Sequence, residues 1–145
     1  MNNGFVIVAH APLASALRAG VLHVFSEHEG QIAAVDVLAH SPPADTRDAI
    51  AQAIAALARP NTLLLTDIVG ATPYSLAREF SNGGSVQLIA GVNLPMLMRV
   101  MTYRGEPLDS LVQRALQGGV NGIELVAPLL PPALSNKNTA QKARA

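Results

Sequence analysis

The sequence has no cysteine and no tryptophan, and its 145 residues include only two tyrosines and three phenylalanines. Without cysteine, the chain can form neither a disulfide nor a thiolate metal site, an absence that is compatible with any cellular compartment. The sequence has few aromatic residues and no stripe of basic residues, so it lacks the features that are usual in nucleic-acid-binding proteins. We therefore expect no nucleic-acid partner.

Charged residues are also scarce, at 14% of the chain against 50% hydrophobic residues. This balance argues against disorder and suggests that some apolar surface is covered by another copy, so we expect a homodimer. The formal net charge is zero, yet the last fifteen residues contain basic side chains and no acid, which leaves the rest mildly acidic. The N-terminal apolar run is short and is broken by His10, which fits neither a signal peptide nor a membrane span. We expect a cytoplasmic protein without membrane insertion.

Short apolar runs alternate with amphipathic helical patterns along the whole chain. The runs typical of buried strands are Phe5–Ala9, Ile32–Leu38, Thr62–Thr66, Val86–Ala90 and Ile123–Ala127. The helices are predicted from Pro12 to about Glu29, over Asp45–Ala58, from Thr72 to about Ser81, over Leu94–Tyr103 and over Pro107–Gln117. Gly118 and Gly119 would end the last helix. This alternation predicts one α/β domain over residues 1–127 with a mostly parallel sheet, followed by a flexible Pro/Ala/Lys tail at 128–145.

Two strand–helix junctions carry the residues that a chemical site needs. His10, in AHAPLASAL, follows the first predicted strand, and Asp67, in TDIVGATPYSLA, follows the third. In an open α/β sheet, ligands bind beyond the carboxyl ends of the strands, so these two residues are expected to share a site. An imidazole can accept a phosphoryl group at neutral pH, and helix N-termini offer N–H groups to its oxygens. His23, His28 and His40 lie in a helix, at its end and in a loop, where a direct role is not expected.

The residues around this junction can be given roles. Asp67 is predicted to accept a hydrogen bond from one ring nitrogen of His10, so that the other nitrogen faces a phosphoryl donor; a turn aspartate is the alternative. Thr72 is predicted to be the N-cap of the following helix, with Pro73 in the first helical position, and its hydroxyl can also contact a phosphate. The two roles of Thr72 compete for one side chain. Gly70 would let the backbone approach the phosphate, although a plain turn glycine is equally simple.

Other classes of site fit these junctions less well. A receiver domain needs an acidic pair after its first strand, where this chain has Ala9-His10-Ala11. A nucleotide-binding fold needs a glycine-rich turn there, and the sequence HAPL contains no glycine. One histidine and one aspartate are fewer ligands than a catalytic zinc usually takes from protein. We therefore expect neither a metal nor a cofactor.

Three segments carry a resemblance to a known family. They are IVAHAPLASAL at the first strand–helix junction, LLTDIVGATPYSLA at the third, and IAGVNLPMLMRVM at Ile89–Met101. Together they resemble the IIA domains of the mannose (mannose–fructose–sorbose) class of the bacterial phosphoenolpyruvate-dependent sugar phosphotransferase system (PTS). The resemblance implies a phosphotransferase component with a phosphohistidine intermediate. His10 would take the phosphoryl group from the phosphocarrier protein HPr and pass it to a IIB domain, and Asp67 matches the acid that partners the histidine.

The resemblance also implies a fold and an assembly. Such domains are flavodoxin-like and doubly wound, and they pair as dimers in which a C-terminal strand, here Ile123–Ala127, adds to the edge of the neighbour's sheet as an antiparallel strand. The chain departs from the family at two places in the phosphate-binding turns. It has Ala11-Pro12 where the family usually has a glycine after the histidine, and Gly70-Ala71 where it usually has two glycines.

Two other functions remain open alongside sugar transport. In a bacterium without the matching permease, the same phosphorylation would report phosphoenolpyruvate supply to a binding partner. The phosphotransfer subunit of a dihydroxyacetone kinase also resembles this pattern, although the GATP and GVNLPM segments favour the mannose class. The sequence does not indicate which sugar is involved.

Overall fold

The computed structural model describes residues 2–130, so most of the predicted tail, residues 131–145, lies outside the described residues. Four parallel strands form one sheet in the order β2-β1-β3-β4. Their bounds are β1 Asn3–His10, β2 Ile32–Val37, β3 Asn61–Thr66 and β4 Val86–Ala90. The predicted α/β fold with a parallel, doubly wound sheet is confirmed. Because the chain leaves β1 for one edge and returns to its other side for β3, the winding direction reverses between β1 and β3.

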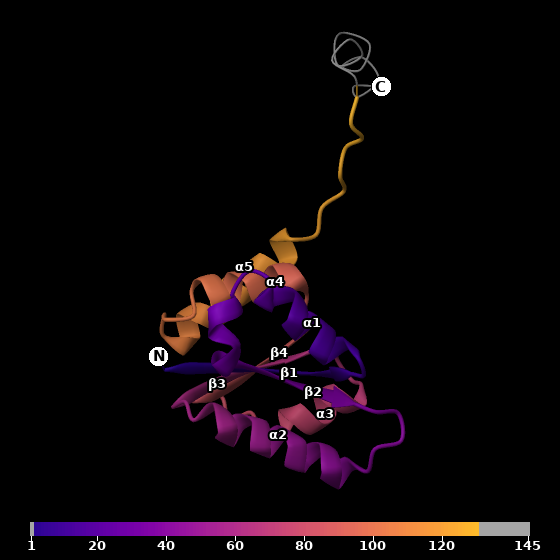
Figure 1. Cartoon of the computed structure of the whole chain (residues 1–145), viewed down its shortest axis with the longest axis vertical. Coiled ribbons are helices and arrows are strands. Elements are labelled where there is room, and N and C mark those ends of the chain that lie inside the picture. The colour runs from indigo at the N-terminus through magenta and orange to yellow at the C-terminus, as the bar shows by residue number, and fades with distance from the viewer. Residues whose placement is uncertain (1, 131–145) are drawn as a thin grey trace.

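Helices cover both faces of the sheet (Figure 1). One face carries α1 (Leu13–Leu22), α4 (Leu94–Thr102) and α5 (Leu108–Asn121), and the other carries α2 (Pro43–Leu57) and α3 (Thr72–Arg78). A short 3-10 helix, η1 (Ser26–Gln31), leads into β2. This coverage explains why the strands have continuous apolar sequences, since the two central strands, β1 and β3, are buried on both faces along nearly their whole length.

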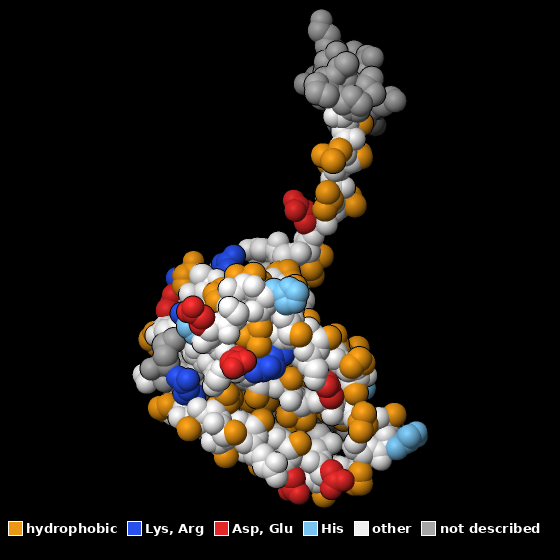
Figure 2. Space-filling model, viewed as in Figure 1, with side chains coloured by type: hydrophobic (Ala, Val, Ile, Leu, Met, Phe, Trp, Pro, Cys, Tyr) orange, Lys and Arg blue, Asp and Glu red, His pale blue; other side chains and the backbone are white. Residues whose placement is uncertain are grey.

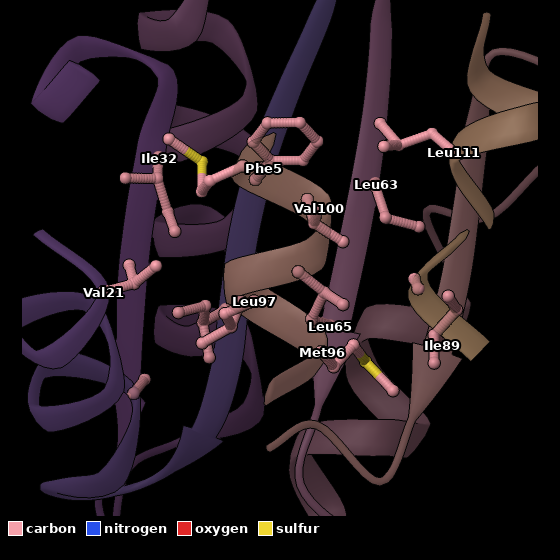
Figure 3. Close-up of a cluster of buried hydrophobic side chains, with 14 of the residues drawn as sticks. Phe5, Val21, Ile32, Leu63, Leu65, Ile89, Met96, Leu97, Val100 and Leu111 are labelled. Carbon is pink, nitrogen blue, oxygen red and sulfur yellow. The ribbon is translucent and has the colours of Figure 1, made fainter. Parts of the chain in front are cut away.

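The core is split into two layers by the alternation of side chains along β1. Phe5 and Ile7 point toward α1, α4 and α5, whereas Val6 and Val8 point toward α2 and α3, and all four are fully buried. Figure 3 shows the first layer, where side chains of α4 lie over those of the central strands. The labelled members are Phe5, Val21, Ile32, Leu63, Leu65, Ile89, Met96, Leu97, Val100 and Leu111.

The first helix is shorter than predicted. It ends at Leu22 rather than near Glu29, and the remaining residues form η1. Arg18 explains the difference, because its guanidinium donates hydrogen bonds to the carbonyls of Glu29, at 2.9 Å, and Ile32, at 2.7 Å. These bonds hold the chain alongside the helix as it turns back toward β2. Pro12 stands just before the helix, not at its first position.

The last helix is longer than predicted, because Gly118 and Gly119 do not end it. Both lie inside α5, where the helix packs against α4. A Cβ atom on Gly118 would lie 2.7 Å from Cβ of Arg99, and one on Gly119 would lie 2.7 Å from Cε of Met96. These glycines therefore allow a close approach of two helices, a role that a sequence pattern does not separate from termination.

The segment after α5 forms no strand with this chain's own sheet. Residues 123–130 leave the body as an extended stretch (Figure 1), and apolar side chains line it (Figure 2). Ile123 is 78% exposed and Leu125 is 99% exposed. The expected strand at Ile123–Ala127 is thus wrong for the single chain, and its addition to a neighbour's sheet stays a prediction. None of the helices within residues 2–130 is long and apolar enough to cross a membrane.

Candidate functional site

The two residues singled out from the sequence lie at one edge of the sheet. His10 is the last residue of β1, and Asp67 directly follows β3. β1 and β3 are adjacent and parallel, with Val8 opposite Thr66, so their carboxyl ends lie side by side at the point where the winding reverses. The fold therefore brings together side chains that are 57 positions apart in the sequence.

The carboxylate of Asp67 accepts three hydrogen bonds from N–H groups. Its Oδ2 lies 2.6 Å from Nδ1 of the His10 ring and accepts the backbone N–H of His10 at 3.0 Å. Its Oδ1 accepts the backbone N–H of Ile68 at 3.0 Å. The Asp67 side chain is 11% exposed, whereas that of His10 is 53% exposed. The carboxylate is thus enclosed and fully engaged, while the ring faces solvent.

The contacts of Asp67 determine its charge and the tautomer of His10. Burial alone would raise the pKa of the Asp67 carboxyl, but the hydrogen bonds from His10 and Ile68, and the charge of the ring when protonated, outweigh burial and hold this pKa below its usual range. Asp67 is therefore ionised at neutral pH and can only accept hydrogen bonds. In the neutral imidazole, Nδ1 therefore carries the proton that is donated to Asp67, and Nε2 carries the lone pair. Within residues 2–130, no side chain or backbone group hydrogen-bonds Nε2.

The turn that follows Asp67 differs from the prediction in its capping. Thr72 is the first residue of α3 rather than its N-cap, which is Ala71, and no side chain caps this helix. The reason is that the backbone is already extended at Ala71, whose carbonyl accepts the N–H of Ser75. The capping prediction for Thr72 is wrong, and its exposed hydroxyl has no hydrogen-bond partner within the described part of the chain. Gly70 has a φ of 88°, a conformation that favours glycine, so the turn itself requires it.

Exposed apolar side chains lie on the segments that follow the strands at the same edge of the sheet as His10. Leu38 follows β2, Ile68 and Val69 follow β3, and Leu13 begins α1. Their exposed fractions range from 40% for Leu13 to 69% for Val69. We call these four residues the apolar rim. Two cavities, of about 480 Å³ beside Arg18 and about 470 Å³ beside Arg99, lie elsewhere on the molecule, and His10 lines neither of them. The exposed ring thus lies on a surface suited to a protein partner more than to an enclosed small molecule.

The GVNLPM segment has a structural explanation. Asn93 caps α4, because its Oδ1 accepts the backbone N–H of Met96 at 2.9 Å. The amide nitrogen of the same side chain donates to the carbonyl of Gly119 in α5 at 3.0 Å. Gly91 has a φ of 89°, which allows the turn out of β4. The segment therefore links α4 to α5, and the N–H groups of Gly91 and Val92 also donate to the carbonyl of Thr66, the residue before Asp67, at 2.9 Å.

Nothing in the sequence pattern singles out Asp36, although it lies near the same edge of the sheet. This aspartate of β2 accepts hydrogen bonds from the backbone and hydroxyl of Ser15 in α1. Its one sequence signal is a charged residue inside an apolar strand. Within the described range, no group of three or more His, Asp or Glu side chains is placed to hold a metal ion.

Comparison with known proteins gives one family and a consistent fold. The sequence family described as PTS system fructose IIA component matches residues 4–115. No curated protein matches the sequence significantly.

The chain is similar in structure to the mannose/sorbose-specific IIA subunit of a phosphotransferase system from Enterococcus faecalis, with a TM-score of 0.78 and 24% identity over 90% of this chain and 100% of that one. It is also similar to the phosphotransferase system component EIIA from Streptococcus agalactiae, with a TM-score of 0.74 and 23% identity over 84% and 95% of the two chains. A sigma-54 interaction domain protein from Enterococcus faecalis has the same fold, with a TM-score of 0.62 and 15% identity over 83% and 93%.

Proposed function

Since the chain belongs to the family of PTS IIA components, we propose that it accepts a phosphoryl group from HPr on Nε2 of His10 and passes it to a IIB component. The observation that carries this proposal is the hydrogen bond between His10 Nδ1 and Asp67, which assigns the proton of the neutral imidazole to Nδ1 and leaves the exposed Nε2 with the lone pair. A nitrogen with a free lone pair at the surface is what a phosphoryl acceptor requires.

The chemistry balances with the residues that are present. The lone pair of His10 Nε2 attacks phosphorus, a bond forms between Nε2 and phosphorus, and the bond from phosphorus to the donor imidazole of HPr breaks. The His10 ring gains positive charge as this bond forms, because Nδ1 keeps its proton. The carboxylate of Asp67, at 2.6 Å, balances that charge without any proton transfer. The same steps in reverse order deliver the phosphoryl group to IIB.

The turn from Gly70 to Thr72 supplies the proposed contacts to the phosphoryl oxygens. The absence of a side-chain cap on α3 leaves the N–H groups of this first turn without a side-chain acceptor. The hydroxyl of Thr72 is exposed and is not used in capping. We assign the backbone of Gly70 and Ala71 and the hydroxyl of Thr72 to phosphate binding.

The apolar rim provides the proposed docking surface for HPr and for IIB. Both partners must bring a phosphorylated or acceptor residue to His10, and exposed apolar side chains at the same edge of the sheet can exclude water from the transfer when a partner covers them. HPr and the phosphoenolpyruvate supply are cytoplasmic, so the proposal places this protein in the cytoplasm.

The assembly that we propose is a homodimer formed by exchange of residues 123–130. Four of these side chains, Ile123, Leu125, Val126 and Leu129, are at least 77% exposed. β4 lies at an edge of the sheet and has an unpaired side. An apolar segment that its own sheet leaves unpaired, beside an open strand edge, is suited to pairing between two copies.

A regulatory role is the second candidate. It is suggested by the fold that this chain shares with a sigma-54 interaction domain protein. In that role, phosphorylation of His10 would control a partner instead of feeding a sugar permease. Transfer from the phosphorylated protein to a purified IIB component distinguishes the two roles.

The test is phosphorylation with radiolabelled phosphoenolpyruvate, the first enzyme of the system and HPr. We expect one phosphoryl group, labile in acid and stable in base, as for a nitrogen-linked phosphate. His10→Ala should take up no label, while replacement of His23, His28 or His40 by alanine should leave the uptake intact. Label on the His10→Ala protein would overturn the proposal.

A further inference from the structure

The first turn of α1 is capped by a side chain from β2, which is distant from it in the sequence. Pro12, at the N-cap position, makes no side-chain cap, and as a proline it has no N–H of its own. Asp36 of β2 takes that role: its Oδ1 accepts the backbone N–H of Ser15 at 3.0 Å, and its Oδ2 accepts the hydroxyl of Ser15. A carboxylate at this place also offsets the positive end of the helix dipole.

This cap lies immediately beside the segment that carries His10. In the pairing of β1 with β2, Ala9 is opposite Asp36 and His10 is opposite Val37. The N–H of Ala11 donates to the carbonyl of Val37 at 2.9 Å. Residues 10–14 are therefore held on one side by β2, and on the other side by Asp67 after β3, which accepts the N–H of His10.

We infer that Asp36 is a positioning residue for His10. The backbone N–H and the ring Nδ1 of His10 share one oxygen of Asp67, so the ring keeps its hydrogen bond only while the backbone stays in place. Four residues, from Ala11 to Ala14, link His10 to Ser15 through Pro12 and the start of α1. Release of the first turn of α1 would let this link shift, and with it the direction of Nε2. The inference deepens the proposed function and rests on it for the reaction, but the position of the ring can be measured without any reaction.

The first experiment is proton–nitrogen NMR of the His10 imidazole at neutral pH in the unphosphorylated full chain. The proton on Nδ1 should give a sharp signal in the wild type, because it is donated to Asp67. In Asp36→Ala this signal should broaden through exchange with water, while in Asp36→Asn it should be largely retained, because the amide oxygen can still accept the Ser15 N–H. The matched control is Arg47→Ala, which breaks the ion pair with Glu79 between α2 and the end of α3.

The second experiment measures phosphorylation by HPr. We expect Asp36→Ala to slow it on the order of tenfold, since misplacement of a reacting group costs rate without removing any chemical group. Asp36→Asn should recover most of that loss, and Arg47→Ala should react at the wild-type rate.

Ser15→Ala, which removes the hydroxyl bond and keeps the backbone bond, gives a milder variant in case Asp36→Ala fails to fold. It should show a smaller change in the same direction. A wild-type Nδ1 signal in Asp36→Ala, or in Ser15→Ala if that variant is the one measured, would overturn the inference. An Asp36→Asn protein as impaired as Asp36→Ala would do the same. If no variant, including the wild type, accepts phosphate, the proposed function fails, while the NMR comparison still decides the role of Asp36.

Discussion

One oxygen of Asp67, Oδ2, accepts hydrogen bonds from both the backbone N–H and the ring Nδ1 of His10, at 3.0 and 2.6 Å. Two donors of the same residue on one acceptor fix the ring relative to its own backbone. The imidazole is therefore held in one rotamer before the phosphoryl transfer that we propose, so part of the entropic cost of ordering the ring is met in the folded chain itself.

Asp67→Asn should separate an electrostatic role from a turn-shaping role. Asparagine can still accept the N–H of Ile68 or of His10, so the fold and the melting temperature should change little. The amide cannot balance the positive charge that grows on the ring, and we expect phosphorylation by HPr to slow by about a hundredfold or more. Stopped-flow or quench-flow rates measure this. A wild-type rate would make Asp67 a turn residue.

Acid should reveal the same contact in the free energy of unfolding. The pKa of Asp67 in the folded protein lies below its usual value of 3.8, so the ionised carboxylate stabilises the fold above about pH 4, and this contribution is lost as the pH falls through the folded pKa. Urea unfolding between pH 7 and pH 2.5 should show the wild type losing more stability than Asp67→Asn. Parallel curves for the two proteins would contradict the assigned pKa shift.

Thr72 offers a test of the phosphate-binding turn. Thr72→Val keeps the shape of the side chain and removes the hydroxyl, so we expect slower phosphorylation on the order of tenfold, the scale of one lost hydrogen bond to a charged group. Because Thr72 caps nothing, the melting temperature should be unchanged. Thr72→Ser, which keeps the hydroxyl, is the control and should react at nearly the wild-type rate. Equal rates for the valine and serine variants would exclude the hydroxyl from the reaction.

The proposed exchange of residues 123–130 is tested by two truncations. Removal of residues 123–145 takes away apolar side chains that are each worth about 1.5–3 kcal/mol when buried, so the protein should become a monomer. Removal of residues 131–145 keeps the segment and should leave a dimer. Sedimentation at micromolar concentration measures both. A full-length monomer would refute the exchange and leave the chemistry of His10 untouched.

The contact between α4 and α5 should be intolerant of a single methyl group. Gly118→Ala would place Cβ 2.7 Å from Cβ of Arg99, and overpacking of this kind typically costs about 1–3 kcal/mol. Gly105→Ala is the matched control, because nothing lies within 4 Å of its added Cβ. Chemical unfolding of the two variants should show a loss for the first and little change for the second. Equal stabilities would mean that the helices can move apart at no cost.

The sequence predicted the structure correctly where a local pattern is typical of only one kind of element or position. Buried apolar runs predicted all four strands of the sheet, and the junctions after β1 and β3 pointed to His10 and Asp67. Both inferences depend on features within a few residues, plus the general rule for where parallel strands end.

Prediction failed where the meaning of a residue depends on a distant partner. Gly118 and Gly119 look like a helix end, and only the position of α4 shows that they are a close contact. Threonine is a residue type that is common at N-caps, but α3 begins one residue earlier than predicted, so that Ala71 is the N-cap and Thr72 is the first helical residue. Asp36 is recognisable only as a charged residue in an apolar strand, and this signal does not show its role, because the N–H that it caps belongs to a helix in a different part of the chain.

The pairing of β1 with β3 also orders events during protein synthesis. His10 leaves the ribosome early, but the oxygen that orients its ring is made 57 residues later and reaches it only when the two central strands have paired. A growing chain thus carries the imidazole long before its orienting carboxylate. Under the proposed function, we expect an incomplete chain not to accept a phosphoryl group from HPr. Newly synthesised protein would become competent for this transfer only once β1 and β3 have paired.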